Sequence, residues 1–169
     1  MEQPRALDHS SPDDEARTMP RCTYVDWCLR SEELDVVKTS AELGIQPSRA
    51  WTKGQKYPSK AFDPKARKTI DAWRFHPWGV WGVNTKGAVD SDQVEPHVLF
   101  LLDLLEPKQH LISNYLENPG VYMVRVSIRW ESPVGYGGFD VSSQVLARIA
   151  ALCHTIHFSL RFDSVADEE

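Results

Sequence analysis

Strict alternation of hydrophobic and polar positions marks the strands that this chain is expected to form. Residues 122–131 give the clearest alternation, with Met123 as the one apolar residue at a polar position, and residues 24–30 and 156–162 alternate over shorter stretches. A period of two places the apolar side chains of a strand on one face of its sheet. Residues 48–52 and 78–83 are shorter candidates, and the second contains two of the six tryptophans. The sequence therefore predicts about five strands, most of them apolar on one face only.

Apolar residues three and four positions apart predict the helices between these strands. Ser31 is expected to cap the first helix, which Gly44 ends in a left-handed conformation. Ser91 caps a second helix, which Pro107 interrupts and which continues as a shorter segment. Ser142 begins the last helix, which leads into the final strand.

A long basic segment separates two of the predicted strands. Residues 54–75 include Pro58 and Pro64, many lysines and few apolar side chains. Prolines and the lack of an apolar period are typical of a loop. We expect a long basic loop here, with one helical turn at residues 65–72.

The predicted elements follow one another in the order β-α-β-β-α-β-α-β. Strands with a single apolar face indicate a mostly antiparallel sheet of about five strands with helices packed on one face. The predicted fold class is therefore α+β. Residues 21–162 form the predicted domain, between a disordered acidic tail at residues 1–20 and an acidic tail at residues 163–169.

Composition restricts the class of protein further. The chain has 169 residues, of which 41% are hydrophobic and 25% charged, as expected for one globular domain. No apolar run approaches the ~20 residues that span a bilayer, and residues 1–20 contain no hydrophobic segment of a secretory signal. The three cysteines have no CxxC spacing. We therefore expect a cytoplasmic protein with reduced thiols and no membrane partner.

The charge is unevenly distributed along the chain. The net charge is −5, but residues 21–162 hold 17 bases and 15 acids, a net charge of +2. Within them, residues 53–74 hold seven bases and two acids, close to four of the six tryptophans. Aromatic and cationic side chains together can bind acidic proteins or nucleic acid. The predicted partner-binding residues are Arg49, Trp51, Lys53, Lys56, Trp73 and Arg74.

The outward face of the sheet is a second candidate surface. Alternation places Arg125, Arg129 and Arg161 on this face, with the other polar positions of the same strands. An exposed antiparallel face needs polar side chains in any case, and long arginines suit it. The alternative interpretation is an open cationic platform for an acidic partner.

No motif in the sequence points to catalysis, a metal or a cofactor. His154 and His157 lie close to Cys153, but a zinc site commonly takes its ligands from two such groups, and the chain has no second one. Residues 135–138 are glycine-rich, yet they have neither the GxSxG nor the GxGxxG spacing. We expect no catalytic residue, no metal, no cofactor and no enzymatic activity.

Several short motifs, taken in order, resemble a known family. They are Leu43-Gly44-Ile45-Gln46-Pro47, Trp51-Thr52-Lys53-Gly54, the tryptophan-bearing strand at residues 78–83, Leu105-Glu106-Pro107-Lys108, and the helix–strand pair at residues 142–162. Together they resemble the bacterial domain-of-unknown-function family DUF4279 over about residues 22–162. The resemblance implies a small α+β fold and a bacterial intracellular protein, and it brings no assigned activity. The lysine-rich residues 55–74 depart from the family pattern.

These features favour a non-enzymatic protein-binding module, immunity-like or regulatory, that contacts an acidic protein. A nucleic-acid-binding accessory protein that uses the basic segment is the first alternative. An unrecognised enzyme or a small-ligand site around Arg49, Trp51 and Tyr136 is the second. No oligomeric state follows from the sequence.

Overall fold

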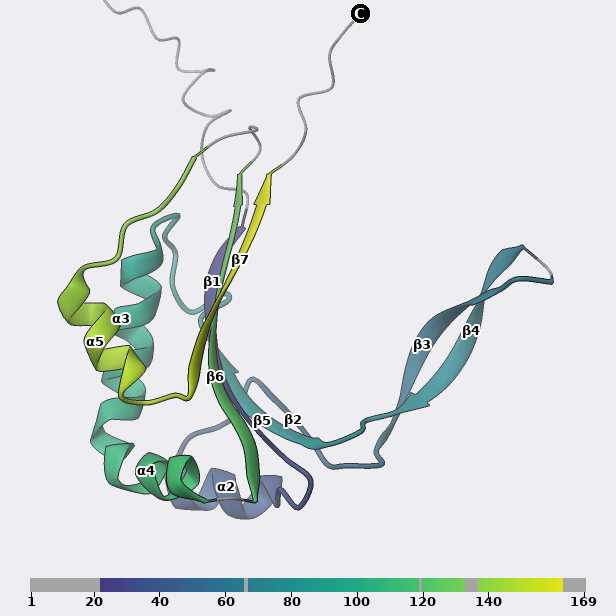
Figure 1. Cartoon of the computed structure of the whole chain (residues 1–169), viewed down its shortest axis with the longest axis horizontal. Coiled ribbons are helices and arrows are strands. Elements are labelled where there is room, and N and C mark those ends of the chain that lie inside the picture. The colour runs from purple at the N-terminus through teal and green to yellow at the C-terminus, as the bar shows by residue number, and fades with distance from the viewer. Residues whose placement is uncertain (1–21, 66, 119, 133–136, 163–169) are drawn as a thin grey trace, which may run out of the picture.

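The computed structural model describes residues 22–65, 67–118, 120–132 and 137–162. The predicted tails, and residues 135 and 136 of the glycine-rich segment, lie outside these ranges. Figure 1 shows three parts: a group of helices, a twisted sheet beside them, and a two-stranded ribbon that extends away from the sheet.

Five strands form the main sheet, as the alternating pattern predicts. They are β1 (Cys22–Ser31), β2 (Arg49–Trp51), β5 (Gly79–Asn84), β6 (Val121–Ser132) and β7 (Thr155–Phe162). Their order in the sheet is β2-β5-β1-β6-β7. All neighbours pair antiparallel except β6 and β7, which are parallel because a helical crossover connects them. The predicted α+β class and mostly antiparallel sheet are confirmed.

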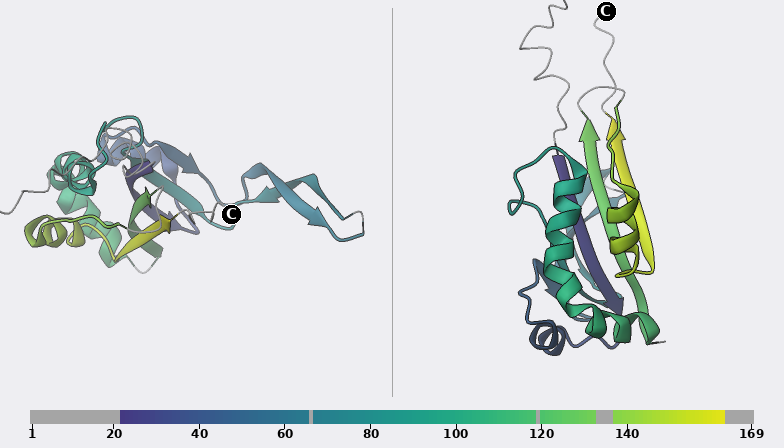
Figure 2. Two further views of the ribbon diagram at one scale, coloured as in Figure 1. Left: turned by 90° about the horizontal axis from the view of Figure 1, so that it is seen from above. Right: turned by 90° about the vertical axis from the view of Figure 1, so that its left-hand side faces the viewer.

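The helices cover one face of this sheet. They are α2 (Val36–Leu43), α3 (Val94–Leu105), α4 (Gln109–Glu117) and α5 (Ser143–Ala150), with a 3-10 turn at Glu106–Lys108 between α3 and α4. In the right-hand view of Figure 2, α3 and α5 lie in front of the strands, and α4 lies near the lower end of α3. The other face of the sheet has no helix on it (Figure 1).

The core lies between the helices and the inward face of the three interior strands, β5, β1 and β6. Trp27 on β1 is fully buried, and its indole N–H donates to the carbonyl oxygen of Leu152 at 2.8 Å. Its ring meets that of Trp81 on β5 edge to face, with centroids 5.9 Å apart. Burying a large apolar side chain contributes about 1.5–3 kcal/mol. The alternation therefore identifies the buried face of the central strands correctly.

The first helix begins later than the sequence suggested. Ser31 ends β1, and its hydroxyl donates to the carbonyl oxygen of Gly120. The carboxylate of Asp35 instead accepts from the backbone N–H groups of Val37 and Lys38 and caps α2. Val37 is 76% exposed, although the apolar positions of this helix, Leu34, Val37, Ala41 and Ile45, predict that it faces the core.

The second helix also begins after its predicted cap. Gln93, not Ser91, precedes α3, and the Ser91 hydroxyl accepts from the N–H of Gln93. Ser142, by contrast, caps α5 as expected, since its hydroxyl accepts from the N–H of Val145. The carboxylate of Glu95 near the start of α3 accepts from both the N–H and the hydroxyl of Ser142, which joins the two helices.

The last strand faces the helices as predicted but is only partly covered. Ile156 packs against the core, whereas Phe158, Leu160 and Phe162 remain exposed to between 42% and 50%. These three side chains stay exposed because β7 is an edge strand of the sheet.

The predicted basic loop is a β-hairpin, so the expectation of a loop with a helical turn is wrong. Strands β3 (Lys56–Asp63) and β4 (Lys68–Phe75) pair antiparallel as a separate sheet. Seen from above in the left-hand view of Figure 2, this ribbon extends away from the rest of the molecule. Both strands lack the apolar period of a half-buried strand because most of their residues are exposed.

Candidate functional site

One face of the hairpin carries large apolar side chains in water. The register places eight residues on this face, which we call the hairpin surface: Lys56, Pro58, Lys60, Phe62, Thr69, Asp71, Trp73 and Phe75. All eight are exposed, and Phe62, Trp73 and Phe75 are 66%, 61% and 64% exposed. Trp73 and Phe75 stand two positions apart on β4, and the Lys60–Asp71 pair separates them from Phe62. Exposed apolar side chains gathered on one face mark interaction sites in many proteins.

Positive charge accompanies these aromatic rings. The ammonium group of Lys56 lies over the Trp73 ring, 4.7 Å from its centroid. Between residues 56 and 75 the sequence has six bases and two acids, so the ribbon has a net charge of +4. Arg74 is exposed but belongs to the opposite face, because it pairs with Tyr57. The hairpin surface thus combines stacking area with cationic charge.

A stack of three rings connects the hairpin to the main sheet. His76 lies between Trp51 and Tyr57, with centroid distances of 4.4 and 4.3 Å and nearly parallel planes. The N–H of His76 donates to the carbonyl oxygen of Gln55, and its own carbonyl oxygen accepts from Gly54. Trp51 therefore helps to hold the base of the hairpin.

The six predicted partner-binding residues do not form one cluster. Lys56 and Trp73 lie together on the hairpin surface, while Trp51 belongs to the ring stack at its base. Lys53 is also near the base and pairs with Glu32 at 2.5 Å. Arg49 is separate from all of these, on the face of the main sheet that has no helix.

That open face carries the polar positions of four strands. Between β1 and β6, Tyr24 lies beside Arg129 and Asp26 lies beside Ser127. Between β6 and β7, Ser127 lies beside His157. Arg125, Arg129 and Arg161 all belong to this face, as the alternation predicted. The arginines do not form a simple platform, because their surroundings differ.

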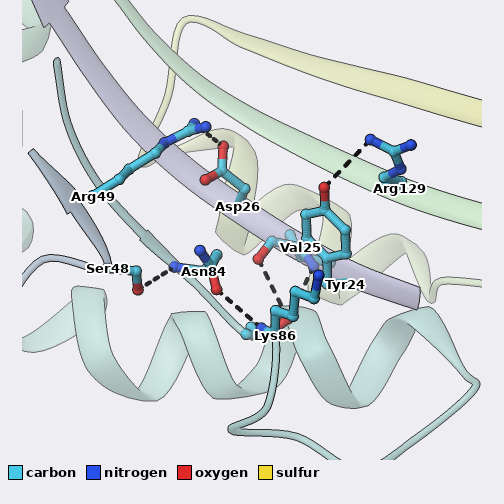
Figure 3. A network of polar contacts seen from close by, with 9 residues as sticks. Tyr24, Val25, Asp26, Ser48, Arg49, Asn84, Lys86 and Arg129 are labelled. Carbon is cyan, nitrogen blue, oxygen red and sulfur yellow. Dashed lines mark hydrogen bonds and ion pairs between the residues drawn. The ribbon is translucent and has the colours of Figure 1, made fainter. Parts of the chain in front are cut away.

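An ion pair crosses the open face near β2. The guanidinium group of Arg49 passes over β5 and binds the carboxylate of Asp26 on β1 (Figure 3). On β5 the side chain of Arg49 passes Gly82, which pairs with Arg49 on one side and with Cys28 on the other. A Cβ atom at position 82 would lie 2.9 Å from the carbonyl oxygen of Trp27 and 3.3 Å from Arg49 Nε.

Asp26 is almost completely enclosed by this arrangement. It is 5% exposed, and burial raises the pKa of its carboxyl above the ordinary value. Three neighbouring guanidinium groups, those of Arg49, Arg125 and Arg30, lower the pKa and offset part of this rise. One carboxylate therefore faces three positive charges.

Arg129 is held by partners of its own. Its guanidinium group donates to the carboxylate of Glu131 at 2.6 and 2.8 Å and to the hydroxyl of Tyr24 at 3.5 Å, the latter drawn in Figure 3. The hydrogen bond from Arg129 lowers the pKa of Glu131. Arg125 differs, because within the described ranges it has no ion pair or hydrogen bond.

A hollow opens between these side chains. Its volume is about 190 Å³. It is lined by Tyr24, Asp26, Arg49, Arg125, Ser127, Arg129, His157 and Ser159. Three strands, β1, β6 and β7, supply seven of these residues, and β2 supplies Arg49.

The histidine near Cys153 has a structural role. The Nδ1 atom of His154 accepts from the N–H of Val124, and its Nε2–H donates to the carbonyl oxygen of Leu116. Both ring nitrogens are therefore engaged in hydrogen bonds between α4, β6 and the start of β7. In the part of the chain that the structure describes, no group of three or more His, Cys, Asp or Glu residues could hold a metal ion.

The chain belongs to the family described as Domain of unknown function (DUF4279). The model of this family matches residues 22–163, which include all five strands of the main sheet and the hairpin. Comparison with curated proteins and with solved structures gave no match. Among the described residues, no helix has the length and apolar character needed to cross a membrane.

Two parts of these sites escaped the sequence analysis. Phe62 was not singled out, and only the pairing of the two hairpin strands places it on the same face as Trp73 and Phe75. The pair between Asp26 and Arg49 requires the strand order, which no local pattern shows. Gly82 is the only local signal of that close approach that the sequence offers.

Proposed function

We propose that this protein is a non-enzymatic binding module of the bacterial cytoplasm, immunity-like or regulatory, whose hairpin surface docks an acidic protein. The observation that supports the proposal is the row of exposed rings, Phe62, Trp73 and Phe75, on a ribbon that extends into solvent. No element of the described chain covers them.

The energetics of burial favour docking of these rings. An aromatic side chain buries about 150–250 Å² when it is covered, and apolar burial contributes about 25 cal/mol per Å². A two-stranded ribbon alone is only marginally stable in water, so a partner that covers it also stabilises it. The hairpin surface therefore has the properties of a binding hot spot, in which tryptophan is enriched.

Charge indicates the chemistry of the partner. The hairpin has an excess of four positive charges, and Lys56 and Lys60 flank the rings on the same face. Complementary charge accelerates encounter and disfavours other partners. A protein with an acidic rim around an apolar groove fits both features.

Nucleic acid is the second candidate, favoured by the lysine that lies over the Trp73 ring. Rings and cations together bind single strands by stacking and charge. This binding would weaken steeply with salt, by about 0.7 per phosphate contact in the logarithmic slope for single strands. The net charge of only +2 over residues 21–162 favours the protein partner.

Site-specific crosslinking tests the proposal. A photoreactive benzoyl-phenylalanine replaces Phe62 in cells of the source organism, and the same residue replaces Gln144 on α5 as the control, which is exposed on the helical side. We expect one acidic protein to crosslink at position 62 and not at 144. With that protein purified, Trp73→Ala should weaken binding at least about tenfold, or 1.4 kcal/mol. Equal crosslinking at both positions, or crosslinks to nucleic acid alone, would refute it.

A further inference from the structure

We propose that the hollow on the open face binds a small phosphate monoester, with Arg125 as its principal ligand. The site is separate from the hairpin surface and shares no residue with it. It therefore adds a small-molecule ligand to the proposed docking of a protein.

The charge balance of the hollow favours an anion. Of the three arginines that line it, Arg49 is bound to the carboxylate of Asp26 and Arg129 to that of Glu131. The surplus within the lining is therefore the one positive charge of Arg125. A phosphate monoester carries about −1.5 to −2 charges near neutral pH.

The hydrogen-bonding groups that line the hollow also favour a phosphate ligand. The Nε atoms of Arg49 and Arg125 and the hydroxyl of Ser127 are buried and have no hydrogen-bond partner in the described part of the protein. Buried donors without acceptors are unfavourable, and phosphate oxygens accept several hydrogen bonds at once. The guanidinium group of Arg125 is also planar and matches two oxygens of a phosphate group.

The neighbouring strand β7 adds further hydrogen-bonding side chains to the wall. On β7, His157 lies beside Ser127 and Ser159 lies beside Arg129, and both residues line the hollow. Asp26 lines it from the β1 side and would repel an anion, so the ligand is expected nearer β6 and β7. The arginines on either side are fixed by Asp26 and Glu131, which keeps the wall ordered before a ligand arrives.

The size of the hollow limits the ligand. The volume of the hollow is about 190 Å³. That is enough for a phosphate group with a short organic chain. Typical sites for larger ligands have volumes of about 300–1,000 Å³.

Calorimetry on the full chain tests the site. Glycerol 3-phosphate and inorganic phosphate are the probes, succinate is the dicarboxylate comparison, and ionic strength is held constant with sodium chloride. We expect saturable binding of glycerol 3-phosphate with a dissociation constant below about 1 mM, and weaker binding of succinate. No saturable binding at about 10 mM ligand, or equal binding of succinate, would overturn the proposal.

Two matched arginine variants locate the binding. Arg125→Gln should weaken glycerol 3-phosphate binding at least about tenfold, whereas Arg161→Gln, on the same face but outside the lining, should leave it unchanged. If Arg125→Gln does not fold, Ser127→Ala takes its place and should weaken binding in the same direction. Equal affinities for the Arg161→Gln variant and the variant in the lining would overturn the assignment.

Discussion

Arg49 on the edge strand β2 binds Asp26 on the central strand β1, across the whole width of β5. The two residues stand 23 positions apart in the sequence, and Gly82 provides the gap that brings them together. Both residues line the hollow on the open face. The ion pair also explains why Arg49, which precedes the basic segment by only a few residues, does not belong to the hairpin surface.

Gly82→Ala should destabilise the protein because the new methyl group has no room. It would lie 2.9 Å from a backbone oxygen and 3.1 Å from the Cβ of Cys28. Overpacking of this kind reduces the free energy of unfolding by about 1–3 kcal/mol, measured by urea denaturation. Gly138→Ala is the control, because nothing lies within 4 Å of its Cβ position. Equal stability of the two variants would show that Gly82 is not required for the close approach.

Thr85 should stabilise the fold through the hydrogen bonds of its hydroxyl and not through the shape of its side chain. The hydroxyl accepts from the N–H of Val25 at 2.9 Å and lies 2.6 Å from Nδ1 of His97, whose Nε2–H donates to the carbonyl oxygen of Ser91. Thr85→Val leaves these buried groups unpaired, at about 1–3 kcal/mol of unfolding free energy for each. Thr85→Ser keeps the hydroxyl and should be closer to wild type. The comparison is made by chemical denaturation, and the reverse order of stability would contradict it.

Cys153 should react slowly with alkylating reagents at neutral pH. Burial raises the pKa of its thiol, and hydrogen bonds from backbone groups offset only part of that rise. Since the thiolate is the reactive form, alkylation should accelerate as pH rises through this raised pKa, later than for the unfolded chain. Mass spectrometry of iodoacetamide-treated protein measures the rate at this residue. If Cys153 were alkylated as fast in the native protein as in denaturant, its thiol would not be protected by burial.

Truncation of a tryptophan to alanine should reduce stability much less on the hairpin than in the core. Trp73→Ala removes a ring that is 61% exposed and should change the free energy of unfolding by no more than about 0.5 kcal/mol. Trp27→Ala removes a fully buried ring and the bond to Leu152, and should cost about 3–5 kcal/mol. Thermal or urea unfolding of both variants checks this, and a large loss for Trp73→Ala would make that ring part of the fold.

The central strands were predictable because one of their faces is buried. Burial of Val25 and Trp27 on β1 imposes the alternation that the sequence displays, and the polar positions between them then define the open face. The hairpin lacks this constraint. Its strands are exposed on both sides, so no apolar period distinguishes them from a loop. The sequence pattern also does not give the order of the strands in the sheet, and the ion pair between Arg49 and Asp26 depends on that order.

The start of α2 was harder to place because two residues that can cap a helix, Ser31 and Asp35, stand four positions apart. β1 extends far enough to include the first, so the second caps α2. Ser142 follows no strand directly and caps α5 as predicted. Competition of this kind is resolved by the length of the preceding strand, which a local pattern does not set.

The role of the hairpin in binding is tested most directly by shortening it within the full chain. Residues 57–74 are replaced by a two-residue Asn-Gly turn. If the hairpin serves binding and not folding, the thermal midpoint should stay within about 4 °C of wild type, equivalent to about 1 kcal/mol. The affinity for the acidic protein captured at position 62 should fall at least about a hundredfold. A shortened chain that no longer folds, or one that binds this partner as tightly as wild type, would contradict the proposed role of the hairpin.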